Sequence, residues 1–142
     1  MQNEIVIEEL NTILRGSYMG VRSIEHYIQK INDDKLKQDF QFIQQEVKQD
    51  AQKLAERIQN LGGVPANSEG ITGSMHSFVH KAMLSDEPNK IIEDAIKGID
   101  NYGVEYSEEI VKGDLDPESK KIINEVIDGN RKHVEHLRGL LH

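Results

Sequence analysis

The sequence predicts an all-α protein, a four-helix bundle of two antiparallel hairpins joined by one long crossover. Three observations predict it. Apolar residues recur at steps of three and four through most of the 142-residue chain, which is the spacing of one helix face. Two of the connections between helices are too short to cross a bundle, so each joins antiparallel neighbours. The third connection is rich in glycine and long enough to pass from one end of a bundle to the other.

The first hairpin comprises helices predicted at about residues 4–31 and 34–61. Asn32-Asp33-Asp34 interrupts the apolar pattern and offers N-caps to the second helix. Gly62-Gly63, followed by Pro65, is the usual pattern at the end of a helix. The apolar positions of the two helices are Leu10, Leu14, Val21, Ile24, Ile28, Ile31, Leu36, Phe40, Ile43, Val47, Leu54, Ile58 and Leu61.

The crossover contains a glycine-rich stretch, residues 62–74, and a short helix predicted at about residues 74–84. Met75, Phe78, Val79 and Met83 lie at helical spacing in that short helix. They form a candidate contact surface for a partner.

The second hairpin comprises helices predicted at about residues 88–112 and 117–141. Pro88 and Pro117 each fit the first turn of a helix, and Gly113-Asp114-Leu115 turns the chain between them. The apolar positions are Ile92, Ala95, Ile99, Tyr102, Tyr106 and Ile110 in the first helix and Ile123, Val126, Leu137 and Leu140 in the second.

Polar residues interrupt the apolar face of two helices, at Gly16-Ser17 and at Asn130-Arg131-Lys132-His133. A polar group inside an apolar seam is costly unless it is hydrogen-bonded or binds a ligand. Counted from the turns near Asp33 and Leu115, one position on each helix lies about four to five turns away: Ser17, Asp50, Ile99 and His133. Val47 and Asn130 lie one turn from Asp50 and His133, on the same helix faces. Six side chains are therefore expected in one layer of the core: Ser17, Val47, Asp50, Ile99, Asn130 and His133.

Five stretches of the chain resemble the ferritin-like superfamily, on its rubrerythrin and bacterioferritin side, and more closely an uncharacterised bacterial ferritin-like family. They are LNTILRGSYMG, QEVKQDAQKLAERIQNLGGVP, GITGSMHSFVHKAM, AIKGIDNYGVEY and GNRKHVEHLRGLL. Together they are spread over the chain from residue 10 to residue 141, so the resemblance implies a single ferritin-like domain over residues 1–142. Members of the superfamily often handle iron or oxidative stress, and the resemblance implies a stress-related role.

The resemblance also implies where a di-iron centre would lie. Active members supply one Glu from each of the first and third helices and a Glu-x-x-His from each of the second and fourth. In this chain the two single Glu positions are Ser17 and Ile99. The two motifs read Val47-x-x-Asp50 and Asn130-x-x-His133. Since no Glu stands at any of the four Glu positions, the resemblance implies a degenerate site, with no resident cofactor expected and iron as the alternative.

Two interpretations of the layer remain open at this point. In the first, Asp50 and His133 form a buried carboxylate–imidazole hydrogen bond, which Ser17 and Asn130 complete. In the second, Asp50 and His133 hold a single divalent metal ion, with Asn130 or a tyrosine as a further ligand.

Other candidate ligands lie outside the layer. Glu25, Glu46 and Glu105 are each one residue from a seam position, so about 100° of helix rotation should turn them toward the flank or solvent. His76 and His80 have a spacing that can bind Zn²⁺ or Cu²⁺, but no third ligand is evident nearby, and a solvated helix face is favoured.

Three aromatic or histidine side chains have simpler interpretations. Tyr102 and Tyr106 are expected to be core aromatics. His136 is expected to be exposed, because only one of His133 and His136 can lie squarely on the seam.

The composition limits the function further. The formal charge is −8, with 25 acidic and 17 basic residues, and cysteine is absent, which excludes disulfides and cysteine chemistry. The acidic charge argues against nucleic-acid binding and against a Dps-type shell that shields DNA. No signal peptide or apolar run of membrane-spanning length is evident. We expect a cytoplasmic protein without nucleic-acid or membrane partners.

The sequence favours a non-enzymatic structural or interaction protein with a degenerate di-iron site, as a homodimer whose protein partner is unknown. The alternative is an iron-binding protein, a ferroxidase or iron store, that uses an altered metal site.

Overall fold

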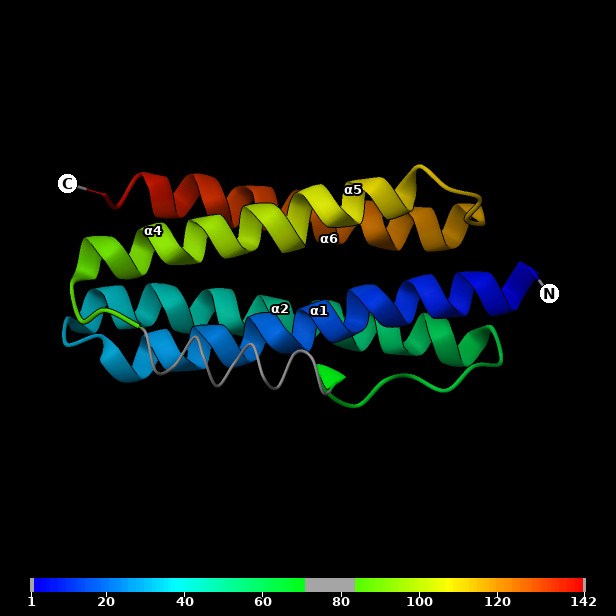
Figure 1. The fold of residues 1–142 in the computed structure, drawn as a ribbon, viewed down its shortest axis with the longest axis horizontal. Coiled ribbons are helices and arrows are strands. Elements are labelled where there is room, and N and C mark those ends of the chain that lie inside the picture. The colour runs from blue at the N-terminus through cyan, green and yellow to red at the C-terminus, as the bar shows by residue number, and fades with distance from the viewer. Residues whose placement is uncertain (1, 71–83, 142) are drawn as a thin grey trace.

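The computed structural model describes residues 2–70 and 84–141, which form a four-helix bundle (Figure 1). Helices α1 (Gln2–Lys30) and α2 (Asp34–Asn60) form the first antiparallel hairpin. The third rod of the bundle consists of α4 (Pro88–Gly98), the π-helix η1 (Ile99–Glu105) and α5 (Tyr106–Val111), end to end. It forms the second hairpin with α6 (Pro117–Arg138). The prediction of an all-α bundle of two hairpins is confirmed.

Local signals start and stop these helices where the sequence places them. The Asp33 side chain accepts a hydrogen bond from the Leu36 backbone N–H at 2.9 Å, and so caps α2. At the other end of α2, Gly62 has a φ of +88°, and the Gly63 N–H donates to the Ile58 carbonyl at 2.9 Å. Glycine is favoured there because this left-handed conformation strains other residues.

The predicted helix bounds agree with the observed ones to within a few residues in α1, α2 and α6. The predicted short helix at 74–84 falls almost wholly on residues 71–83, outside the described residues, and so does the candidate contact surface from Met75 to Met83. The predicted helix at 88–112 is the one that differs in kind, because a π-helix interrupts it.

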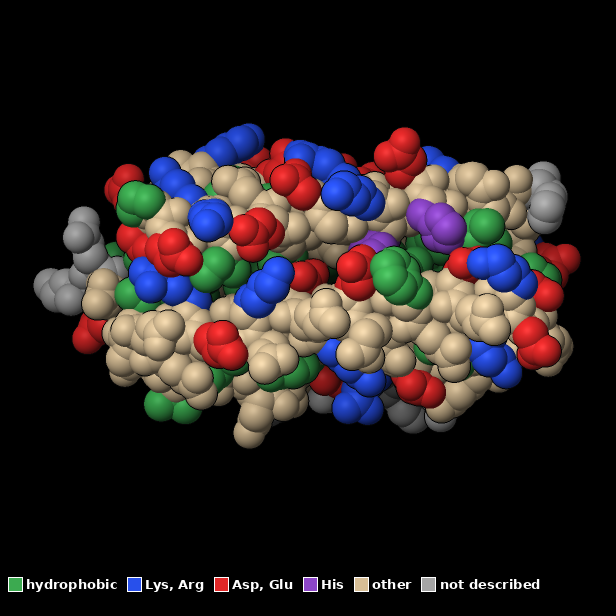
Figure 2. Space-filling model, turned by 180° about the vertical axis from the view of Figure 1, so that it is seen from behind, with side chains coloured by type: hydrophobic (Ala, Val, Ile, Leu, Met, Phe, Trp, Pro, Cys, Tyr) green, Lys and Arg blue, Asp and Glu red, His purple; other side chains and the backbone are tan. Residues whose placement is uncertain are grey.

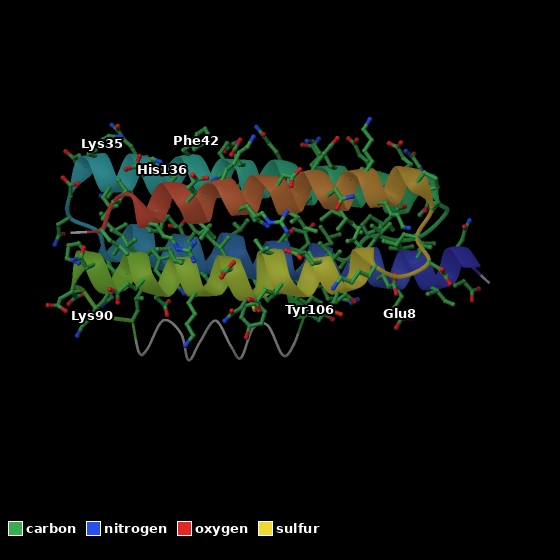
Figure 3. All side chains as sticks on the ribbon, turned by 90° about the horizontal axis from the view of Figure 1, so that it is seen from above. Glu8, Lys35, Phe42, Lys90, Tyr106 and His136 are labelled. Atoms are coloured by element: carbon green, nitrogen blue, oxygen red, sulfur yellow. The ribbon has the colours of Figure 1, made fainter. Side chains whose placement is uncertain are left out.

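The π-helix corrects the prediction that Tyr102 and Tyr106 are core aromatics. These side chains are 52% and 50% exposed, whereas Val104 and Ser107 are buried. A π-turn accommodates one extra residue and rotates everything beyond it by about 100° relative to a straight α-helix. The apolar face that begins at Ile92 therefore continues through Val104 rather than Tyr102, and Figure 3 shows Tyr106 pointing away from the bundle.

The core consists of two separate hydrophobic clusters, one toward each end of the bundle. Buried residues of the first cluster come from the N-terminal half of α1, the C-terminal half of α2, η1 and the first half of α6; they include Leu10, Leu14, Leu54, Ile58 and Ile123. The second cluster includes Ile24, Phe40, Ile43, Ile91 and Leu137. The apolar packing is thus interrupted near the middle of the bundle.

Side chains of α1 hold the start of the crossover in place. Asn11 donates from its amide to the Val64 carbonyl at 3.2 Å and accepts from the Ala66 N–H at 2.7 Å. Further along, the Arg22 Nε lies 2.8 Å from the Glu69 carboxylate, whose side chain is only 4% exposed. These contacts fix the path of residues 64–69 along α1.

Acidic and basic side chains are interspersed over the face of the molecule that Figure 2 shows. Among the described residues, no helix is both long and apolar enough to cross a membrane.

Candidate functional site

The two core clusters meet at a polar layer near the middle of the bundle. Along α1 the first cluster ends at Leu14 and its neighbour Tyr18, and the second begins at Val21. Along α2 the second cluster ends at Val47, and the first cluster begins at Ala51. Between them lie the polar residues Ser17 on α1, Asp50 on α2, and Asn130 and His133 on α6.

The six predicted positions differ in burial. Ser17, Val47, Asn130 and His133 are buried, whereas Asp50 and Ile99 are only partly buried. Ile99 is the first residue of η1. Gly20, one turn beyond Ser17, brings α1 close to Val47, since a Cβ on Gly20 would lie 3.7 Å from a Val47 methyl.

Asn130 is committed to the π-helix. Its Nδ2 donates to the Gly103 carbonyl at 2.9 Å, and a Cβ on Gly103 would lie 2.7 Å from that nitrogen. Glycine at this position therefore allows α6 to approach η1 closely enough for the hydrogen bond. The buried amide is satisfied by backbone, as buried polar groups usually are.

We expect Gly103→Ala to lower the free energy of unfolding by about 1–2 kcal/mol, because the added methyl displaces the Asn130 amide from its buried partner. Chemical denaturation measures the loss. Gly98→Ala is the matched control in α4: its Cβ meets nothing within 4 Å, so helix propensity alone should raise stability by about 0.5–1 kcal/mol.

The steric cause can be separated from an intrinsic effect of alanine on the π-helix. In an Asn130→Ala background the methyl of Gly103→Ala has room, and its cost should disappear. An equal loss of stability in both backgrounds would contradict the proposed clash.

His133 lies against Glu46 rather than Asp50. Its Nε2 is 3.2 Å from the Glu46 Oε1, but the geometry gives no hydrogen bond, and this buried nitrogen has no other partner. The imidazole also meets the Phe42 ring edge-on, with ring centroids 6.3 Å apart. Burial lowers the pKa of His133; Glu46 opposes this shift and His136 adds to it, so the ring is neutral at pH 7.

The predicted hydrogen bond between Asp50 and His133 is not formed, because the register between α2 and α6 places them about one turn apart. Four side-chain contacts fix this antiparallel register: Arg57 with Ser119, Lys53 with Glu125, Glu46 with His133, and Asp39 with His136. The residue opposite Asp50 thus lies between Glu125 and His133.

Glu25, Glu46 and His136 lie beside the layer on α1, α2 and α6. Glu46 was expected to face the flank, but its carboxylate reaches the layer although its side chain is 43% exposed. Glu25 does lie on the flank, where it accepts a hydrogen bond from Gln44. His136 is half-exposed at 51%, as expected, and its Nε2 lies 3.3 Å from Asp39. Figure 3 shows His136 and Phe42 on the side of the bundle where α2 and α6 meet.

Asp50 is a partly buried carboxylate. Burial raises its pKa to about 7; Lys53 opposes the shift, whereas Glu46 and Glu125 add to it. A carboxyl group held in this way is partly protonated at neutral pH.

The donor set does not fit a di-iron centre. Such a centre needs several carboxylates that converge with two imidazoles. Among the described residues, no group of three or more His, Cys, Asp or Glu could hold a metal ion. Three of the four Glu positions have side chains with no carboxylate or amide oxygen: Ser17, Val47 and Ile99. The fourth is Asn130, whose amide nitrogen already donates to Gly103.

The sequence analysis missed Gly103 and Phe42 as residues of the layer. Gly103 gave a signal in its position near the middle of a helix pattern, where glycine commonly marks a close approach. Phe42 also gave a signal, because it is an aromatic residue that lies beside the apolar face of α2.

The fold is ferritin-like, of the kind found in Dps proteins. The chain superposes on a point mutant of Dps1 from Mycobacterium smegmatis with a TM-score of 0.82, at 15% identity over 99% of this chain and 97% of that one. It superposes equally on a Dps protein from Vibrio cholerae O1, described as a member of a broad superfamily of ferritin-like diiron-carboxylate proteins (TM-score 0.82, 19% identity, 99% and 91% covered). At these identities the likeness concerns the fold alone.

The particular family follows from the sequence. A family model described as a domain of unknown function (DUF2383) matches residues 5–113, and the chain belongs to this family. A two-domain protein from Anabaena variabilis, with DJ-1/ThiJ/PfpI-like and ferritin-like domains, is similar over 97% of this chain (TM-score 0.80, 20% identity). The chain spans 39% of that protein's length. No curated protein matches the chain.

Proposed function

We propose that this protein is a ferritin-like bundle that has lost its di-iron centre and acts as a non-enzymatic structural or interaction protein. One observation carries the proposal: the layer where the relatives' fold would place metal ligands is built from a hydroxyl, two aliphatic side chains and an amide bonded to backbone. We also propose a role in iron or stress handling, and only the resemblance to the ferritin-like superfamily supports this part of the proposal.

The remaining ionisable groups of the layer support the same proposal. Asp50 lies about one turn from His133, and burial with two acidic neighbours raises its pKa although Lys53 opposes the shift. Two carboxylates and one imidazole in this arrangement do not supply the charge that two iron ions require.

We expect protein purified without chelator to contain far less than one iron per chain. After Fe(II) is added in air, the near-ultraviolet absorbance of Fe(III) should rise no faster than in buffer. Stoichiometric iron together with oxygen-dependent oxidation would overturn the proposal and support a ferroxidase or iron store.

A second candidate function rests on a different observation, the buried Nε2 of His133, which has no hydrogen-bond partner and faces the Glu46 carboxylate at 3.2 Å. An imidazole and a carboxylate at this separation could share one divalent cation, with water completing its coordination. The protein would then bind a single metal ion without forming a di-iron pair.

Isothermal titration with Zn²⁺ separates the two candidates. If the protein is a non-enzymatic structural protein, the His133→Phe variant should bind Zn²⁺ no more weakly than the wild type. Binding of one Zn²⁺ per chain that is lost in both His133→Phe and Glu46→Gln, but kept in Glu25→Gln, would favour the single-cation site. Glu25→Gln is the matched control, because Glu25 is an exposed carboxylate outside the layer.

A further inference from the structure

The outer face of α2 carries an uneven share of one residue type. The chain has nine glutamines, and seven of them lie on α2, with none after Gln59. Gln44 is buried and donates to the Val21 carbonyl and the Glu25 carboxylate. The other six are exposed, so packing inside the bundle does not explain their presence.

Five of these glutamines form one continuous ridge with an exposed phenylalanine. Positions three, four and seven residues apart share a helix face, and the ridge is about 21 Å long at 1.5 Å per residue. Phe42 is 62% exposed and points outward from α2 in Figure 3. We call this set the glutamine ridge: Gln38, Gln41, Phe42, Gln45, Gln49 and Gln52.

The ridge is poor in charge although the protein is rich in it. Of the eleven exposed residues of α6, eight are charged, whereas five of the thirteen exposed residues of α2 are. Within residues 38–52 of α2, Lys48 is the one residue that is both charged and classed as exposed; Glu46 turns toward His133. In Figure 2, which shows the side where α2 and α6 meet, neutral polar side chains and backbone (tan) form broad areas along α2.

We infer that the glutamine ridge is the contact surface for a second copy of this chain, with the two α2 helices packed antiparallel across a two-fold axis. This inference deepens the proposed structural role by naming its first partner. It does not depend on whether the polar layer binds metal.

Two physical arguments select a second copy as the occupant. Each copy carries a net charge of −8, so copies repel each other, and the repulsion is weaker where they meet through a face poor in acidic groups. A glutamine amide both donates and accepts hydrogen bonds. A row of glutamines is therefore complementary to itself, which is what a two-fold interface requires.

Phe42 supplies the apolar anchor of this contact. Exposed aromatic side chains near the centre of an interface contribute much of its binding energy, while charged residues are depleted there. The ridge is narrow, about one helix wide, so the buried area lies at the small end of specific interfaces. We therefore expect a dissociation constant in the micromolar range.

Sedimentation velocity at protein concentrations from 1 to 500 μM tests the inference. We expect the wild-type chain to shift from monomer to dimer over this range. The double variant Gln45→Glu, Gln49→Glu places four like charges in the contact and should weaken the dimer at least tenfold. The matched control, Asn67→Asp with Asn124→Asp, adds the same charge at exposed positions outside α2 and should leave the dimer unchanged.

A mixing experiment excludes misfolding as the cause of dissociation. The variant Gln45→Lys, Gln49→Lys should also be monomeric alone, but it should form a heterodimer when mixed with the glutamate variant. Circular dichroism should show equal helix content in all variants.

Two results would overturn the inference: a wild-type chain that stays monomeric at 500 μM, or any assembly whose mass the glutamate variant leaves unchanged. These outcomes leave the proposed loss of the di-iron centre untouched, since that rests on iron content and Fe(II) oxidation. Conversely, a dimer that binds iron would overturn the proposed function and leave the interface standing.

Discussion

Replacing Asp116 with alanine is expected to lower the free energy of unfolding by about 2–3 kcal/mol, the sum of a lost helix cap and lost charge-assisted hydrogen bonds. Its Oδ2 accepts from the Ser119 N–H at 3.0 Å and from the Arg57 Nη2 at 2.6 Å. Its Oδ1 accepts from the Ser119 hydroxyl at 2.6 Å. Asp116 therefore both starts α6 and ties it to the end of α2.

Thermal unfolding measures this effect, and the melting temperature should fall by about 6–10 °C for a domain of this size. Asp114→Ala is the matched control, because Asp114 is an exposed residue of the same turn; its effect should stay within about 0.5 kcal/mol. A loss of similar size at Asp114 would contradict the role given to the cap.

The Asp116 effect should also depend on pH. Partial burial alone would raise the pKa of Asp116, but the hydrogen bonds from Ser119 and the charge of Arg57 hold it below its usual value. A depressed carboxyl pKa stabilises the fold above the pKa of the unfolded chain, and this contribution is lost as pH falls through the folded-state pKa. The difference between wild type and Asp116→Ala should therefore shrink as the pH falls below about 4.

The second prediction has the opposite sign: Asp50→Asn should stabilise the protein at alkaline pH. Burial raises the pKa of Asp50 to about 7, so the folded chain keeps a proton that the unfolded chain has already released. Wild-type stability then falls as pH rises from about 4 to 7. Asparagine is neutral throughout, so the variant should be more stable at pH 8 by about 1–2 kcal/mol, since water reaches part of the side chain and screens the penalty.

Denaturation curves at pH 5 and pH 8, recorded in the presence of a chelator, check this prediction. The gain should be large at pH 8 and small at pH 5, whereas the control Asp114→Asn should change neither. An Asp50→Asn variant that is less stable than wild type at pH 8 would show that the ionised carboxylate makes a favourable contact within the fold, and it would contradict the penalty assigned to its burial.

The hairpins and the polar layer could be predicted because their signals are local. Periodicity along one helix reveals its buried face, and caps such as Asp33 and Asp116 act on residues three positions away. The polar interruptions at Ser17 and Asn130 are visible for the same reason, since each contrasts with apolar neighbours on its own helix.

The pairing of Asp50 with His133 could not be predicted in this way. It depends on the register between α2 and α6, two helices that are not joined by a turn. An offset of one turn changes every cross-bundle contact while leaving both helix patterns intact. That offset explains why His133 meets Glu46.

The tyrosines were misplaced for a different reason. The third rod of the bundle has two apolar series, one through Tyr102 and Tyr106 and one through Val104, and both fit a helical period. Only the π-turn decides between them, and nothing in the spacing of the residues reveals it. The structure buries Val104 and exposes both tyrosines.

The same π-turn affects how the third-helix metal position is numbered in this chain. Counted back from the turn at Leu115 as a regular α-helix, that position falls on Ile99; when one extra residue is allowed for in η1, it falls on Gly98. Gly98 has no side chain, and a Cβ built there would meet nothing within 4 Å. Neither way of counting therefore places a carboxylate at the third-helix metal position.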